Sequence, residues 1–164
     1  MILRMVTLTA LAILAGQVFS ASARAGLAEG QAAMAANDFK RAMAEFLPAA
    51  QAGNADAEEL IGVLYAMGLG VERDDRRAFD WYLRASLKSH PGAQSGIGWY
   101  YEVGRGMPAP DTVRAYAWYT LSAIGGDPDA AISQEEIAKK MTPEQIAEAL
   151  VLIDDYRAHL YPLK

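Results

Sequence analysis

The sequence predicts an all-α fold, an α-solenoid of stacked antiparallel helix pairs closed by a C-terminal pair of capping helices. A stretch rich in glycine, tyrosine and aliphatic residues recurs 36 positions later without a gap. Within each copy, apolar residues recur at the spacing of one helix face. The length of 164 residues, 52% of them hydrophobic and 21% charged, fits one ordinary folded domain with a real core.

The N-terminal segment has the three parts of a secretory signal peptide. Residues 1–4 carry a positive charge, residues 5–16 are almost wholly apolar, and residues 23–25 supply small residues at a plausible cleavage point. The apolar part is shorter than the ~20 residues of a transmembrane helix. We therefore expect residues 1–25 to be a signal peptide and residues 26–164 to form a repeat domain in the periplasm or outside the cell, without stable membrane insertion.

The repeat has two halves. Residues 60–70 match residues 96–106 at an offset of 36, and residues 74–82 match residues 111–119 at an offset of 37. The added residue falls in a proline-containing segment between the halves, where a loop tolerates insertion. A weaker copy lies upstream, and we expect units at about residues 27–58, 59–94 and 95–130, with a C-terminal cap over residues 131–164.

Each unit reads as two helices with recognisable ends. Gly68 is suited to the left-handed C-cap of the first helix, and Asp74 or Asp75 to the N-cap of the second. Gly62 and Gly98 lie inside helices, where glycine costs ~1 kcal/mol relative to alanine, so we expect close helix crossings there. The residues expected to face these glycines are Ala78 and Ala115, with Tyr65 and Tyr101 filling the adjacent gaps.

The C-terminal part follows a different pattern. Asp127 and Pro128 are typical of a helix start, and the segment Thr142–Gln145 is a capping box for a second helix. The charged pairs expected at i, i+4 are Glu135 with Lys139 and Glu136 with Lys140. The apolar stripe expected on the last helix consists of Ile146, Ala149, Leu150, Ile153 and Leu160.

The segment from Gly62 through Gly68 and Gly70, followed by Asp75, Ala78, Trp81, Tyr82 and Ala85, resembles the Sel-1-like repeat, a relative of the tetratricopeptide repeat. The resemblance covers roughly residues 27–130. It implies a right-handed superhelix whose concave face, lined by the first helix of each unit, binds proteins or peptides. It also implies, as an alternative, a hydrolase of β-lactams or cell-wall fragments, because some cysteine-rich members have been linked to penicillin binding; this chain has no cysteine.

The chemistry of the sequence argues against an enzyme. No serine is followed by lysine at the Ser-x-x-Lys spacing that penicillin-recognising enzymes use. The two histidines, His90 and His159, are too few and too far apart for a metal site. We interpret His90 as a residue of the loop between units and His159 as a complement to a helix dipole. We expect no cofactor, and Glu58 and Glu59 are interpreted as solvated charge. The net charge of -5 argues against nucleic-acid binding, which usually requires a basic surface.

The candidate binding residues are those that vary between otherwise matching units. Trp99 matches Val63, Glu102 matches Ala66 and Arg105 matches Leu69. An exposed tryptophan in a groove is a favoured anchor for a partner. We therefore expect a monomeric, exported scaffold that binds an unidentified protein or peptide; self-association through an open end of the stack is a further alternative. The candidate partner-binding residues are Trp99, Glu102, Arg105, Val63 and Glu59.

Overall fold

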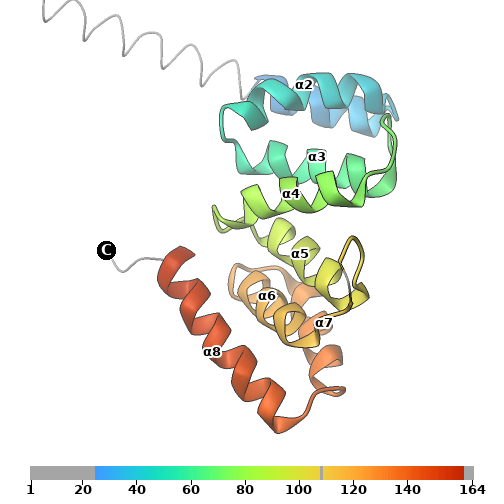
Figure 1. The fold of residues 1–164 in the computed structure, drawn as a ribbon. Helices are drawn as coiled ribbons and strands as arrows, with labels where there is room; N and C mark the ends of the chain where they lie inside the picture. The colour runs from blue at the N-terminus through green and yellow to red at the C-terminus, as the bar shows by residue number, and fades with distance from the viewer. Residues whose placement is uncertain (1–24, 108, 161–164) are drawn as a thin grey trace, which may run out of the picture.

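The computed structural model describes residues 25–107 and 109–160, so nearly all of the expected signal peptide lies outside the described residues. Within these two ranges the chain forms helices and no strands, which confirms the predicted all-α solenoid (Figure 1). The helices are one over residues 25–35, then α2 (Phe39–Gln51), α3 (Ala55–Met67), α4 (Asp75–Ser86), α5 (Pro91–Val103), α6 (Thr112–Ile124), α7 (Pro128–Ala138) and α8 (Pro143–Leu160).

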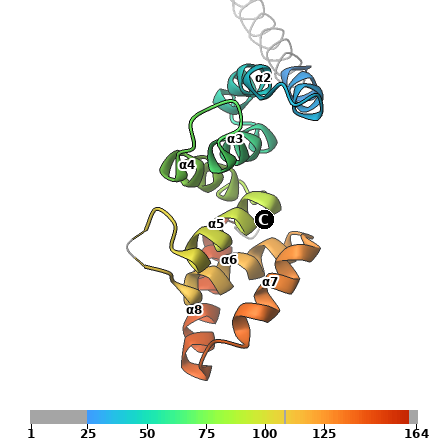
Figure 2. The ribbon, with the colours of Figure 1, turned by 90° about the vertical axis from the view of Figure 1, so that its right-hand side faces the viewer.

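The helices stack in the order of the sequence. α3 packs on α4 and α5 packs on α6, and the contact between α4 and α5 joins these two pairs. Turned by 90°, the structure shows the pairs one beyond the other along the stack (Figure 2). The core follows the same pattern, because each cluster of buried residues combines side chains from neighbouring helices. Local packing of this kind is what a repeat architecture requires.

The first helices of the two central pairs begin four residues before the limits expected at residues 59 and 95. The side chain of Asn54 accepts a hydrogen bond from the backbone N–H of Ala57 at 2.8 Å and caps α3. Nδ1 of His90 accepts one from the N–H of Ala93 at 3.2 Å and caps α5. The interpretation of His90 as a loop residue was therefore incomplete. His90 caps α5, because its ring accepts a hydrogen bond from an amide that the helix leaves without a partner.

The predicted ends of these helices are confirmed. Gly68 and Gly104 have φ values of 68° and 66° and form the left-handed C-caps of α3 and α5. Asp74 caps α4, and Asp111 caps α6 at the equivalent position. The alternative cap, Asp75, instead accepts hydrogen bonds from the Arg73 guanidinium.

The helical glycines contact aromatic rings, not the alanines that we expected. A Cβ atom built on Gly62 would lie 2.8 Å from the Tyr82 ring, and one built on Gly98 would lie 2.8 Å from the Tyr119 ring. The expectation of Ala78 and Ala115 was wrong because the ring four residues further along the second helix fills the crossing. The atoms nearest to a Cβ at either glycine belong to these two rings, and none of them belongs to Tyr65 or Tyr101.

The first helix pair repeats the same relationship. A Cβ atom on Gly30 would collide with the ring of Phe46, which is fully buried in α2. The degenerate upstream copy in the sequence is therefore a true helix pair, with phenylalanine in place of the tyrosine.

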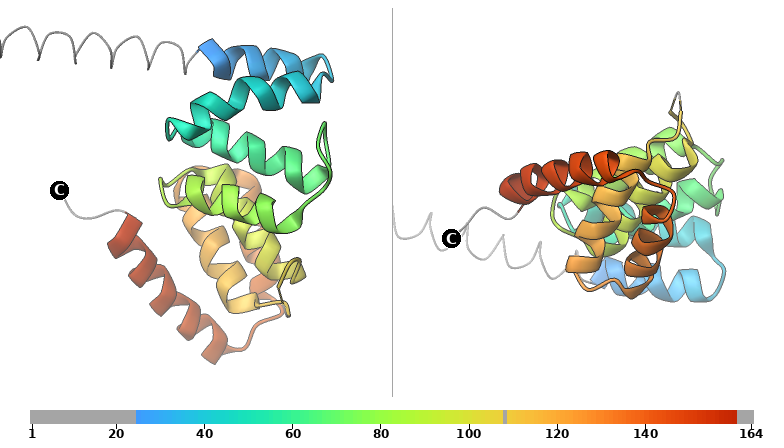
Figure 3. Two further views of the ribbon diagram at one scale, coloured as in Figure 1. Left: turned by 45° about the horizontal axis from the view of Figure 1, so that its top comes forward. Right: turned by 90° about the horizontal axis from the view of Figure 1, so that it is seen from below.

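The C-terminal helices close the stack without forming another repeated pair. α7 and α8 each pack against α6, and α8 runs back along the stack towards the turn between α4 and α5 (Figure 3). Asp127 caps α7 as predicted. The capping box of α8 is also confirmed, since Thr142 and Gln145 exchange side-chain to backbone hydrogen bonds of 2.9 and 3.2 Å.

Two expectations about these helices were wrong. α7 ends at Ala138, so Lys139 pairs with Glu136 at 2.5 Å and Lys140 approaches Glu102 at 3.7 Å, instead of forming the i, i+4 pairs. In the expected stripe of α8, Leu150 is 51% exposed, while Ala149 and Ile153 are buried. α8 crosses α6 at an angle that turns Leu152 and Tyr156 inward in place of Leu150.

Glu58 was interpreted wrongly as solvated. Its side chain is fully buried in the contact between α3 and α4. It forms an ion pair with Lys88 and another with Arg84, whose Nε lies 3.2 Å from Oε1. Gln94 occupies the equivalent buried position in the next pair. The carboxylate can be buried because two long side chains reach it, Arg84 from α4 and Lys88 from the turn after α4.

Candidate functional site

A shallow groove of about 330 Å³ lies between the first helices of the two central pairs. α3 contributes one wall and α5 the other, and the ring of Tyr82 from α4 lies between them. Gly96 brings the α5 backbone to this ring, since a Cβ atom there would lie 3.2 Å from it. The residues lining the groove are Val63, Ala66, Met67, Tyr82, Gly96, Trp99, Tyr100 and Arg105.

Trp99 and Arg105 form one end of this groove. The guanidinium of Arg105 lies over the Trp99 ring at 5.5 Å from its centroid, within the range of a cation–π contact. Nε of Arg105 lies 3.1 Å from Oδ2 of Asp75, which fixes the guanidinium from the side of α4. The Trp99 ring also packs edge-on against Tyr100 at 5.2 Å. Trp99 is nevertheless 39% exposed, so part of a held aromatic ring faces solvent.

The opposite wall is apolar. Val63, the counterpart of Trp99 in the preceding unit, lines it together with Ala66 and Met67. Met67 is 68% exposed, and Val103, one turn after Trp99, is 44% exposed. A methionine side chain adapts its shape to different partners, because it is unbranched and flexible. The groove therefore combines a positioned aromatic group with an adaptable apolar one.

Glu102 does not belong to the groove. Three residues along a helix turn the side chain by about 300°, so Glu102 lies about 60° around α5 from Trp99, on the side of α6. Its Oε2 accepts a hydrogen bond from the Tyr119 hydroxyl at 2.9 Å, and Lys140 lies 3.7 Å from its Oε1. Glu102 thus connects α5 to α6 and to Lys140, which lies two residues after the end of α7.

Glu59 lies one turn before Val63, next to the start of α5, and does not line the groove itself. Its Oε1 would be 3.7 Å from a Cβ atom on Gly92. Burial raises the pKa of Glu59 to about 7, and the nearby charge of Asp56 adds to this increase. Nε2 of His90 contacts Asp56 at 3.1 Å. Because Nδ1 of this ring accepts the capping bond, Nε2 carries the N–H group and donates a hydrogen bond to Asp56.

The structure therefore brings together three of the five residues predicted for binding, namely Val63, Trp99 and Arg105. Sequence reasoning missed Met67 and Gly96. Their positions were available as a signal, because Met67 is four residues after Val63 and Gly96 three before Trp99, and both spacings keep residues on one helix face. Within residues 25–107 and 109–160, no three side chains of histidine, aspartate or glutamate are placed to hold a metal ion.

Comparison with known families accounts for this architecture. The Sel1 repeat family matches residues 55–90 and again residues 91–127. The first match begins with α3 and the second with α5, so each covers one helix pair together with the connection to the next. The chain contains two Sel1 repeats. The helix pair before residue 55 and the two C-terminal helices lie outside the matched segments.

Curated relatives of the repeat segment include proteins of Arabidopsis thaliana and Saccharomyces cerevisiae. The chain is 38% identical over 69 residues to the ERAD-associated E3 ubiquitin-protein ligase component HRD3A of Arabidopsis thaliana. It is 33% identical over 78 residues to the chitin synthase regulator SKT5 of Saccharomyces cerevisiae. These matches cover 42% and 45% of the chain but about a tenth of either relative, 10% and 11% respectively.

Two solved structures share the fold over most of the chain. One is a protective antigen of uropathogenic Escherichia coli with an SLR fold, at a TM-score of 0.80 and 26% identity over 85% of this chain and 31% of that one. The other is a Sel1 repeat protein from Oxalobacter formigenes, at a TM-score of 0.65 and 30% identity over 79% of this chain and 54% of that one. Both alignments extend beyond the residues that the Sel1 repeat family matches.

Among the described helices, none combines the length and the apolar character needed to cross a membrane.

Proposed function

We propose that this chain is a non-enzymatic, exported scaffold that binds a segment of a partner protein in the groove between α3 and α5. The observation that carries the proposal is the exposed Trp99 ring, fixed beneath Arg105 at the edge of an apolar groove. Tryptophan and arginine are enriched among the residues that dominate binding energies at protein interfaces. A partner segment with an aliphatic or aromatic side chain would bury it against Trp99, Val63 and Met67.

Preorganisation supports this proposal. Trp99 packs on Tyr100, and Asp75 holds Arg105, so a partner would not have to order these side chains on binding. Ordering a flexible side chain at an interface costs about 0.5 to 1.5 kcal/mol, and this cost is already met in the free scaffold. The relatives named as a ligase component and a synthase regulator are consistent with a role through other proteins.

Site-specific photocrosslinking would test the groove. A benzophenone amino acid at Met67 should capture a partner from extracts of the native cell envelope, and Trp99→Ala in the same chain should reduce that capture at least tenfold. Val151, which is 70% exposed on α8, is the matched position outside the groove. Capture that is equal from both positions, or that survives Trp99→Ala unchanged, would remove the groove as the binding site.

The location in the cell envelope is a separate proposal that is supported by the sequence of residues 1–25 alone. Cell fractionation of the full chain, and of a chain that starts at residue 26, would test it. We expect the full chain in the periplasm or the medium and the shortened chain in the cytoplasm. Equal distribution of both chains would contradict export while leaving the groove proposal intact.

A further inference from the structure

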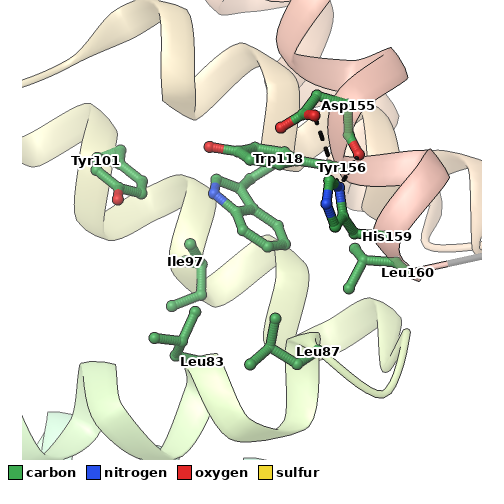
Figure 4. A pocket seen from close by; sticks show the side chains of 9 residues that line it. All are labelled: Leu83, Leu87, Ile97, Tyr101, Trp118, Asp155, Tyr156, His159 and Leu160. Carbon is green, nitrogen blue, oxygen red and sulfur yellow. Dashed lines mark hydrogen bonds and ion pairs between the residues drawn. The ribbon is translucent and has the colours of Figure 1, made fainter.

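A second cavity lies on another part of the molecule, between α8 and the body of the stack (Figure 4). Its volume is about 430 Å³, within the range of about 300 to 1,000 Å³ found for small-molecule sites. It shares no lining residue with the groove between α3 and α5. We call it the α8 pocket, and its lining residues are Leu83, Leu87, Ile97, Tyr101, Trp118, Asp155, Tyr156, His159 and Leu160.

The path of α8 creates this pocket. The helix packs on α6, and its C-terminal end reaches the turn after α4, where the Ser89 hydroxyl contacts the Leu160 carbonyl at 3.5 Å. Between these two points, leucine and isoleucine side chains of α4 and α5 face α8 across an open space (Figure 4). Leu87 remains 58% exposed in this position. Apolar surface is thus left uncovered inside a concave site, where an apolar ligand would gain by excluding water.

One wall of the α8 pocket is aromatic. The rings of Trp118 and Tyr156 stack with their centroids 4.9 Å apart and their planes 28° apart. Trp118 is only 5% exposed, so the core holds its ring in place, and Tyr101 contributes another ring to the lining. Flat faces held in this way favour a planar aromatic ligand over a flexible chain, because stacked rings add about 0.5 to 1.5 kcal/mol beyond area burial.

The charge at the rim decides which aromatic ligands fit. Asp155 is 61% exposed at the pocket edge, and its nearest basic partner among the lining residues is His159, with Nδ1 at 3.6 Å from Oδ1. The nine lining residues that Figure 4 labels include no lysine or arginine. The rim therefore presents negative charge, which disfavours an anionic ligand.

We propose that the α8 pocket binds a small, uncharged aromatic molecule of two or three rings. The rings lie against Trp118 and Tyr156, and the aliphatic side chains of Leu83 and Leu87 cover the other side. This site is separate from the protein-binding groove, so either can be present without the other.

Two dyes with the same aromatic skeleton test the proposal. N-phenyl-1-naphthylamine is uncharged, and 8-anilinonaphthalene-1-sulfonate adds a sulfonate to that skeleton. Fluorescence titration of the chain should give saturable binding of the uncharged dye and at least fivefold weaker binding of the sulfonate. Asp155→Asn should strengthen sulfonate binding about two- to fivefold, because a charge about 4 Å away in water contributes about 1 kcal/mol, and should leave the uncharged dye unaffected.

Filling the pocket tests its location. Leu87→Trp should weaken binding of the uncharged dye at least tenfold, and this position is exposed enough to accept the larger side chain without disturbing the core. Ile132→Trp, at a 61% exposed position on α7 that lines neither the groove nor the α8 pocket, is the matched control and should change the affinity less than twofold. Leu87→Asp, which places a charge at the same edge, is a second variant whose effect does not depend on filling volume.

Several results would overturn the proposal. They are an uncharged dye that does not bind, an affinity unchanged in both Leu87 variants, or a loss of binding in Ile132→Trp alone. A dye signal that falls as the protein concentration rises would also overturn it, because a second copy of the chain would then cover the pocket.

Discussion

The backbone of Gly62 lies against the ring of Tyr82, so closely that a Cβ atom on the glycine would be 2.8 Å from the ring carbon Cδ1. Gly98 and Tyr119 repeat this relationship at 2.8 Å in the next pair. Because glycine has no side chain at this point, the first helix of each pair can pack closely against the second helix. This contact sets the spacing within each pair, and the spacing in turn places α3 and α5 on either side of the groove.

Gly62→Ala should destabilise the protein by about 1 to 3 kcal/mol, because overpacking outweighs the ~1 kcal/mol that alanine gains in helix propensity. Urea unfolding followed by circular dichroism would measure the free energy of unfolding. Tyr82→Leu removes the ring, so Gly62→Ala should cost clearly less in that background. Equal costs in both backgrounds would show that the ring does not set the helix spacing.

Gly68→Ala and Gly104→Ala should both destabilise, because alanine resists the left-handed conformation of these C-caps, with a cost of about 1 kcal/mol. We expect the larger loss at Gly104, where a Cβ atom would lie 2.6 Å from the backbone nitrogen of Pro110. At Gly68 its nearest neighbour is the Arg73 Cβ at 3.1 Å. Thermal unfolding of the two variants would rank them. Gly68→Asn is the control and should retain more stability than Gly68→Ala, since asparagine tolerates positive φ.

Lys88→Met should destabilise the protein by about 1 to 3 kcal/mol, because it leaves the buried Glu58 carboxylate with one cationic partner in place of two. Glu58→Gln imitates Gln94 at the equivalent position and should be milder. In that background Lys88→Met should cost little, since no buried charge remains to be paired. A double-mutant cycle on unfolding free energies measures this coupling, and additive costs would mean that the two side chains do not interact.

Stability should fall as the pH rises from about 4.5 to 7, in proportion to the contribution of Glu59. Burial raises the pKa of Glu59 to about 7 in the folded protein, above its value in the unfolded chain. Between these two pKa values the folded state holds a proton that the unfolded state has released. The free energy of unfolding therefore decreases as the pH rises, and the decrease is complete above the folded pKa.

Glu59→Gln should thus raise the free energy of unfolding, relative to the unaltered chain, more at pH 8 than at pH 4.5. We expect a gain of about 1 to 2 kcal/mol after allowing for solvent screening of a half-buried group. Urea unfolding at both pH values would measure it. Glu148→Gln, at an exposed position on α8, is the control and should show no such pH-dependent gain. A Glu59→Gln profile parallel to that of the unaltered chain would contradict the raised pKa.

Local features of the fold were readable from the sequence because they depend on neighbours along one helix. The caps at Asp74, Asp111 and Asp127 satisfy amides two or three residues away, and the reciprocal bonds of Thr142 and Gln145 close within one turn. The left-handed glycines Gly68 and Gly104 likewise respond to their own backbone. A repeat period then predicts stacking, because each helix pair buries its apolar face against the next.

Tertiary structure decided the features that depend on the angle and distance between helices. Sequence indicated that Gly62 marks a close crossing, but it did not show that Tyr82 fills it. Periodicity placed Glu102 near Trp99, yet the rotation about α5 turns its side chain to Tyr119. The adjacent acidic residues Glu58 and Glu59 predicted a solvated pair, yet Glu58 is buried and forms ion pairs with Lys88 and Arg84.

The sequence by itself therefore determined that the chain folds into helix pairs, where α4, α6, α7 and α8 begin, where α3 and α5 end, and that Trp99 is a candidate anchor. The α8 pocket and the grouping of Trp99, Arg105 and Met67 were decided by tertiary structure. The physical reason is range: capping and periodicity act over three or four residues of one helix, whereas a cavity depends on how two helices cross, and small side-chain differences at the crossing set that geometry.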